Sequence, residues 1–348
     1  MEQTTVQPQR VPPQAIIMQM AMGGWVARTI AEIIRLEIPD VLKRNGPMTA
    51  AALVAEGVEV NAGALERVMR ACTSLGLFTE DSEGRFGITE LAEVLTSDSP
   101  ASVKLLAREM GSSWTDILPH LGAVIRTGEP QAHKLYGMGW WDYLKANPKE
   151  METFGETMKA NSVNSLRGVL QHCDFSGVRK VVDVGGGFGH LVAALLEKWP
   201  HLNGVLLDVP DLIPVAQRSL PLPDAVASRL EYVGADMFSV VPRADAYVLK
   251  HIVHDWDDEH CHQLLSNCFN SMDGAGRLLC VDSVLPPLGD TSATPAKFLD
   301  LMMMALIRGK ERTLQQWEDL YKSAGFRVTN VIPLHDNFGT SIVEGAKA

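Results

Sequence analysis

The chain has 348 residues, of which 46% are hydrophobic and 21% charged, a composition typical of a soluble globular protein. This length is too great for one ordinary core, so we expect two domains, or one large and one small domain. The formal charge of −11 and the lack of a long basic run argue against an extended nucleic-acid-binding surface.

The amino-terminal region predicts neither a signal peptide nor a membrane span. Residues 1–13 are polar and contain prolines, without an apolar core. The apolar-rich run 15–34 is interrupted by Arg28 and Glu32, which suits a buried or subunit-facing helix better than a bilayer. The five cysteines form no C-x-x-C pair, which favours reduced thiols. We therefore expect a cytoplasmic protein without a membrane partner.

Residues 47–96 follow the order helix, turn, helix, short hairpin, helix, which is that of a winged helix. Thr49 and Asn61 are predicted to cap the first two helices, Gly76 to end the second, and a Ser-Glu-Gly turn to join two strands. Winged helices often bind DNA, but three basic and eight acidic residues here leave a net charge of −5, which would repel phosphates. We therefore expect a structural or dimerising role and no nucleic-acid partner.

Residues 101–170 are predicted to be helical, with breaks at Gly128–Pro130 and Pro148. After Phe175 the pattern changes to short runs of β-branched and aliphatic residues, most of them followed by a helical stretch. This alternation predicts an α/β fold with a Rossmann-like, mostly parallel sheet covered on both faces. Strands near 327–332 and 340–344 follow one helix closely, so we expect the sheet to end in an antiparallel pair.

A glycine-rich loop, in VVDVGGGFGH, follows the first predicted strand of this sheet. Ligands of such sheets bind at the carboxyl ends of the strands. Gly185, Gly187 and Gly189 form G-x-G-x-G, whereas the dinucleotide fingerprint requires G-x-G-x-x-G and has its third glycine where His190 stands. The loop thus departs from the dehydrogenase pattern but still permits close approach of a ligand to the backbone.

Two further strand ends carry side chains that suit an adenosyl group. Asp208 ends the next strand, 25 residues after Asp183, where a carboxylate can bind both ribose hydroxyls. Asp236 and Met237 follow the third strand and suit the adenine amino group and ring face. Glycines alone would be a weak signal, and a plain tight turn with solvated aspartates is the alternative. Together the three strand ends predict an adenosyl ligand.

The segments DVGGGFG, LLDVP, GADMF, LKHIVHDWDDEHC and GKERT resemble the motifs of caffeic-acid-type O-methyltransferases, which use S-adenosyl-L-methionine. The resemblance covers nearly the whole chain, and the bacterial branch of that family acts on phenazines, polyketides and similar aromatic metabolites. It implies S-adenosyl-L-homocysteine as a product and a homodimer formed through the winged-helix region. The implied cofactor-binding residues are Gly185, Gly187, Asp208, Val209, Asp236, Met237 and Lys250.

The same resemblance implies three functional regions. These are a winged-helix dimerisation domain over residues 1–105, a helical connector lining the acceptor pocket over 106–170, and a class I methyltransferase domain that binds the cofactor over 171–348.

The segment KHIVHDWDDEHC begins at the carboxyl end of the fourth predicted strand. A phenol has a pKa of about 10, so its methylation needs a base, and histidine suits that role. The resemblance selects His254 as the base and implies that Glu311 and Asp282 orient its ring. Asp282 is one methylene shorter than the glutamate usual in plant members, so we expect Glu311 to make the closer contact.

Alternatives to this chemistry stay open. The segment also offers residues of the types that bind zinc: His254, Asp255, Asp258, His260 and His262. Their spacing is not H-E-x-x-H, so we expect no metal, a surface position for His260 and His262, and first-turn helix acids at 257–259. The same cofactor could serve N-methylation or a diverted decarboxylase or hydroxylase activity. A winged-helix regulator that senses an adenosyl ligand is an alternative of another class.

Two segments, FGETMKANS and FLDLMMMALIRGKERT, match the family regions that line the acceptor pocket. Asn161 stands where plant enzymes tend to have histidine, and Leu306 where some have asparagine, which argues against a monolignol acceptor. Flexible methionines suit a flat aromatic ring, although the run 302–304 cannot all face one side of a helix. The implied substrate-binding residues are Phe154, Met158, Asn161, Met302 and Leu306.

Overall fold

The computed structural model describes residues 11–348 except 293, 335 and 337, and except the side chains of residues 161, 164 and 294. The chain divides into two compact units, Met1–Asp116 and Ile117–Ala348. The division into three functional regions that we expect from the sequence stays a prediction.

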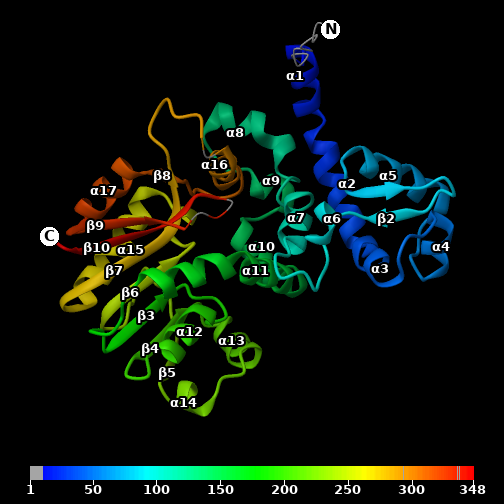
Figure 1. The fold of residues 1–348 in the computed structure, drawn as a ribbon. Coiled ribbons are helices and arrows are strands. Elements are labelled where there is room, and N and C mark those ends of the chain that lie inside the picture. The colour runs from blue at the N-terminus through cyan, green and yellow to red at the C-terminus, as the bar shows by residue number, and fades with distance from the viewer. Residues whose placement is uncertain (1–10, 293, 335, 337) are drawn as a thin grey trace, which may run out of the picture. The chain divides into compact units, whose positions relative to one another are not determined.

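The first unit is mostly helical and contains the expected winged helix (Figure 1). Thr49 caps α4 by accepting a hydrogen bond from the Ala52 amide at 3.1 Å, and Asn61 caps α5 in the same way. The hairpin pairs β1 with β2 antiparallel. The elements of this unit are α1 (Pro13–Ala21), α2 (Gly23–Arg35), α3 (Ile38–Asn45), α4 (Ala50–Ala55), α5 (Ala62–Ser74), β1 (Phe78–Glu80), β2 (Phe86–Ile88), α6 (Glu90–Glu93) and α7 (Lys104–Met110).

The second unit begins with helices and continues into an α/β sheet. Its leading helices are η1 (Leu118–His120), α8 (Leu121–Thr127), α9 (Ala132–Tyr136), α10 (Trp140–Ala146) and α11 (Pro148–His172). The strands are β3 (Lys180–Val184), β4 (Asn203–Asp208), β5 (Leu230–Gly234), β6 (Ala244–Lys250), β7 (Met272–Leu285), β8 (Arg312–Thr313), β9 (Phe326–Pro333) and β10 (Thr340–Lys347). Between them lie α12 (His190–Lys198), α13 (Ile213–Ser219), α14 (Asp224–Ala227), η2 (Val253–Asp255), α15 (Asp258–Ser271), α16 (Thr294–Leu306) and α17 (Leu314–Ser323).

The sheet confirms the predicted fold class. Its strand order is β5-β4-β3-β6-β7-β10-β9, with β8 paired to β7 (Figure 1). Strands β3 to β7 run parallel, and β10 runs antiparallel to both β7 and β9. Two apolar cores lie against the sheet, one with α15 and α17 and the other with α11, α12, α13 and α14. Helices therefore cover both faces, as a parallel sheet requires.

The strand order also predicts where a ligand binds. The chain runs outward from β3 through β4 to β5, then returns to the other side of β3 as β6. The carboxyl ends of β3 and β6 therefore flank a topological switch point. Within the described part of the chain, no helix is both long and apolar enough to cross a membrane.

Candidate functional site

The glycine loop between β3 and α12 forms the first part of the site. Gly185 and Gly187 have positive φ values of 65° and 60°, which disfavour other residues. The Gly187 amide donates a hydrogen bond of 2.8 Å to Oδ2 of Asp208, the last residue of β4. Oδ1 of Asp208 accepts a second bond, 2.7 Å long, from the Val209 amide. The loop and the end of β4 thus meet through one carboxylate.

Two other predicted cofactor residues, Asp236 and Lys250, already form hydrogen bonds in this structure. Asp236 is exposed, and its carboxylate accepts hydrogen bonds from the Phe238 amide at 3.0 Å and the Ser239 hydroxyl at 2.9 Å. The Lys250 ammonium donates to the Ser162 hydroxyl at 2.7 Å. A carboxylate has further lone pairs and an ammonium has further N–H donors, so these bonds leave both side chains able to bind a ligand as well.

Two polar atoms near the loop are buried without a hydrogen-bond partner in the part of the chain that the structure describes. Oδ1 of Asp183 and Nε2 of His190 have no hydrogen-bond partner among the described residues. Burial raises the pKa of Asp183 to about 6, although Lys250 and the Val192 amide act in the opposite direction. Asp183, His190 and Asp208 thus place three polar side chains beside the glycine loop at the switch point.

His254 lies in η2, shortly after the end of β6, and is 9% exposed. Its Nδ1 forms a 2.7 Å hydrogen bond with Oε1 of Glu311, a residue distant in the chain. Oδ1 of Asp282 lies 4.0 Å from the same nitrogen, and Oδ1 of Asp255 lies 3.5 Å from Nε2. The structure therefore brings the three predicted residues together, with Glu311 as the closer partner, and adds a third carboxylate.

This carboxylate cluster changes the acidity of the imidazole. Burial alone lowers the pKa of His254, but the charges of Glu311, Asp282 and Asp255 outweigh it and raise the pKa to about 10. Burial in turn raises the pKa of Asp255 to about 7 and also raises that of Glu311, whereas His254 lowers both. The cluster thus stabilises the protonated imidazole, the form that results when a base accepts a proton.

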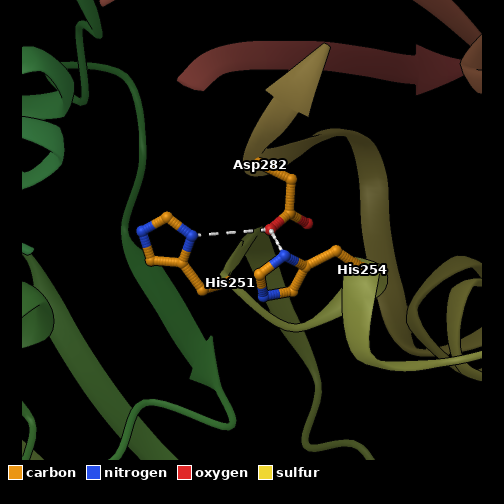
Figure 2. Close-up of side chains that lie close together, drawn as sticks. All are labelled: His251, His254 and Asp282. Carbon is orange, nitrogen blue, oxygen red and sulfur yellow. Dashed lines mark ion pairs between the residues drawn. The ribbon is translucent and has the colours of Figure 1, made fainter. Parts of the chain in front are cut away.

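Sheet register explains why Asp282 reaches this cluster. Lys250 at the end of β6 pairs with Val281 in β7, so the residues that follow each, His251 and Asp282, lie together. Figure 2 shows one Asp282 oxygen between the two imidazoles, 3.7 Å from Nδ1 of His251. His251 has a positive φ of 55°. Neither Asp282 oxygen has a hydrogen-bond partner in the described part of the chain.

Sequence reasoning missed the roles of Asp255 and His251 in this cluster. Asp255 follows His254 directly, so the only available signal was adjacency. His251 follows Lys250 at the end of β6. The sequence does not show that Asp282 of β7 lies beside it, because that depends on how the two strands are aligned.

The residues that the sequence offers as alternative zinc ligands do not gather at one point. His260 and His262 are exposed on α15, where His260 bonds Asp257 and His262 bonds Ser323. A different trio, His251, His254 and Asp282, has ligand-type atoms within 4.8 Å of one another. One of these atoms belongs to the imidazole that Glu311 already holds.

The predicted acceptor residues gather mainly in one apolar cluster of the second unit. Leu306 is buried in this cluster, and the half-buried Phe154 and Met302 pack against it. The Phe154 ring also makes T-shaped contacts with the rings of Trp140 and Trp141. Met158 is half-buried on α11. The side chain of Asn161 lies outside the described residues.

The Rossmann-like sheet, the glycine loop, the strand-end aspartate and the carboxylate-held histidine match the arrangement that the sequence predicts for an S-adenosylmethionine-dependent methyltransferase. The chain matches the O-methyltransferase domain model over residues 118–327 and the O-methyltransferase dimerisation domain model over residues 18–98. It therefore belongs to the O-methyltransferase family, as the sequence motifs predict.

Three relatives illustrate the similarity. The chain is 34% identical to phenazine O-methyltransferase PhzM of Lysobacter antibioticus, over 96% of each chain. The structure of mitomycin 7-O-methyltransferase MmcR matches with a TM-score of 0.87 and 31% identity, over 96% of this chain and 98% of that one. A third match is the O-methyltransferase NcsB1 from neocarzinostatin biosynthesis, whose structure was solved with S-adenosylmethionine and 2-hydroxy-5-methyl naphthoic acid. It has a TM-score of 0.80 and 28% identity, over 93% of this chain and 96% of that one.

These matches confirm the predicted enzyme class, an O-methyltransferase that uses S-adenosylmethionine.

Proposed function

We propose that this enzyme methylates a hydroxyl group of a small aromatic metabolite and that His254 is the general base. The observation that carries the proposal is the 2.7 Å bond between Nδ1 of His254 and Glu311. A carboxylate on Nδ1 fixes the tautomer that leaves the lone pair on Nε2, which is the arrangement a base requires.

The electrostatics of the cluster suit a phenolic substrate. A phenol has a pKa of about 10, and the pKa of His254 is also raised to about 10. The two pKa values are close, so proton transfer from the acceptor to a neutral His254 imidazole is close to thermoneutral, although that neutral form is the minor one near pH 7. Glu311 and Asp282 would orient the ring and stabilise the imidazolium, and Asp255 would add to that stabilisation.

The cofactor supplies an activated methyl group when it binds. Asp208 would bind the ribose hydroxyls, and Gly185 and Gly187 would let the ligand approach the backbone. Val209, Asp236 and Met237 would contact the adenine side, and Lys250 would complete the set. The chain would otherwise accelerate the reaction by positioning the two reactants and excluding water.

The acceptor is proposed from the relatives and from the apolar cluster. Phenazine O-methyltransferase, mitomycin 7-O-methyltransferase and the naphthoic acid complex of NcsB1 all point by name to ring systems. Phe154, Met302 and Leu306 lie in a cluster with several aromatic rings, which suits a flat acceptor. Met158 and Asn161 complete the proposed set, and the dimerisation domain supports a homodimer.

Calorimetric titration with S-adenosylmethionine tests the site, followed by turnover with a panel of hydroxylated aromatics. We expect saturable binding that Asp208→Ala weakens at least about tenfold, because each lost charge-assisted hydrogen bond costs about 1.5–3 kcal/mol. Asp211→Ala removes an equal charge three residues away, at an exposed position, and should leave the affinity unchanged. Equal affinity in the Asp208 variant would contradict the proposed ribose contact, and no methylated product from any hydroxylated aromatic would contradict the proposed function.

A further inference from the structure

The segment Gly309–Arg312 contacts the chain around His254 at several points, and the bond from Glu311 to Nδ1 is only one of them. We propose that Gly309 and Arg312 are positioning residues that hold the backbone of His254 while Glu311 holds its ring. This inference rests on the proposed role of His254 as the base.

Arg312 binds the carbonyl groups on either side of the His254–Asp255 pair. Nη1 donates to the Val253 carbonyl at 3.0 Å and Nη2 donates to the Trp256 carbonyl at 3.0 Å. The side chain is 0% exposed and forms an ion pair of 2.9 Å with Asp258, at the start of α15. A planar guanidinium fixes both carbonyls in one rigid geometry, which a lysine could not do.

Burial of this cation needs a reason other than stability. A buried ion pair costs so much desolvation that apolar residues of similar volume are often as stabilising. Asp258 is 58% exposed, so the partner charge of Arg312 is itself partly solvated. What the guanidinium provides, and an apolar side chain would not, is a fixed position for the 253–256 backbone.

Gly309 makes the closest approach to that backbone. A Cβ atom there would lie 2.0 Å from the His254 carbonyl oxygen and 2.9 Å from the Asp255 backbone. The next residue, Lys310, donates its amide to the same His254 oxygen at 2.9 Å. Any side chain at position 309 must therefore push the two segments apart.

The four residues act on both ends of His254. Gly309 and Lys310 fix its carbonyl, Glu311 fixes Nδ1, and Arg312 fixes the flanking carbonyls. The β8 pairing of Arg312 with Val284 in β7 ties this segment to the same strand that carries Asp282. A displacement of about 1 Å in such a constellation costs about 100-fold in rate.

Gly309→Ala tests the proposal most directly, with Gly177→Ala as the matched control. Neither glycine has a positive φ, and an added Cβ at Gly177 meets no atom within 4 Å. We expect Gly309→Ala to lower kcat by about 30- to 100-fold, with unchanged affinity for S-adenosylmethionine, and Gly177→Ala to match the parent. An unchanged kcat in Gly309→Ala would overturn the proposal.

A double-mutant cycle separates positioning from a general loss of structure. If Gly309 acts through His254, Gly309→Ala should cost nothing further when His254 is already alanine. A full additional loss in the double variant would show that Gly309 acts elsewhere and would overturn the proposal. If His254→Ala alone leaves kcat unchanged, His254 is not the base. This outcome does not depend on the result for Gly309.

A spectroscopic readout does not depend on turnover. The short bond between His254 and Glu311 should give a downfield proton resonance that His254→Ala removes. We expect the resonance to shift or vanish in Gly309→Ala, and to weaken in Arg312→Lys, which keeps the charge but loses the fork. An unperturbed resonance in both variants would contradict the positioning role.

Discussion

The loop 250–256 and the helix start 257–262 are adjacent in the chain and each contain two histidines, yet the surroundings of these histidines are opposite. His254 and His260 each bond a carboxylate at almost the same distance, 2.7 Å to Glu311 and 2.6 Å to Asp257. The side chain of His254 is 11% exposed and that of His260 is 46% exposed. Solvent screens the electrostatic attraction between His260 and Asp257, whereas it screens that between His254 and Glu311 much less.

This comparison shows that residue type alone does not set the electrostatic environment of a histidine. His260 and Asp257 belong to one helix start, where the Asp257 carboxylate also accepts the His260 amide as a cap. His254 instead meets carboxylates from three other positions: its neighbour Asp255, strand β7 and the segment before β8. Burial together with charges from distant segments sets its chemistry.

The variants His254→Ala and His260→Ala, measured in parallel, test the difference between the two histidines most strongly. Loss of a general base costs about 10²- to 10⁴-fold, so we expect kcat to fall by that factor in the first variant, with cofactor affinity preserved. The second variant should turn over at the parent rate. Steady-state kinetics with a phenolic acceptor measures both, and a fully active His254→Ala enzyme would remove the base from the mechanism.

A smaller effect should follow from Asp282→Asn, measured as the pH dependence of kcat/KM. The raised pKa of His254 means that the neutral imidazole is the minor form near pH 7, so activity should rise as the pH increases toward about 10. Asp282 contributes to that raised pKa. Removing its charge should lower the pKa and move the rise to lower pH by about one unit.

The matched control for this pH experiment is Asp257→Asn in the exposed pair, which should leave the profile in place. If the profile of Asp282→Asn coincided with that of the parent, the carboxylate would have no electrostatic role at His254.

The smallest effect belongs to the helix start. Asp257 is the N-cap of α15, and its Oδ1 accepts a hydrogen bond of 3.0 Å from the His260 amide. The variant Asp257→Ala removes this cap. We expect a loss of about 1 kcal/mol in the free energy of unfolding, because one amide loses its partner, with kcat unchanged. Chemical denaturation measures the loss, and a large fall in kcat would show that the exposed region does take part in the reaction.

Much of the fold could be predicted because it depends on local patterns. The caps Thr49 and Asn61, the hairpin and the alternation of strands and helices each depend on neighbouring residues. The glycine loop and Asp208 were also accessible, since the carboxyl ends of adjacent parallel strands lie at one edge of the sheet. The contacts of Asp236 and Lys250 were not, because both side chains bond atoms that no strand pattern identifies.

The sequence by itself determined the α/β class, the winged helix, the glycine loop and the family to which the chain belongs. Only the tertiary structure decided which of three neighbouring histidines is buried, and that Asp255, His251 and Arg312 lie around it. The physical reason is register: the pairing of Lys250 with Val281 and of Arg312 with Val284 brings together residues about 30 to 60 positions apart in the chain. Local periodicity carries no information about such alignments, since a parallel pair is set by the packing of the whole sheet.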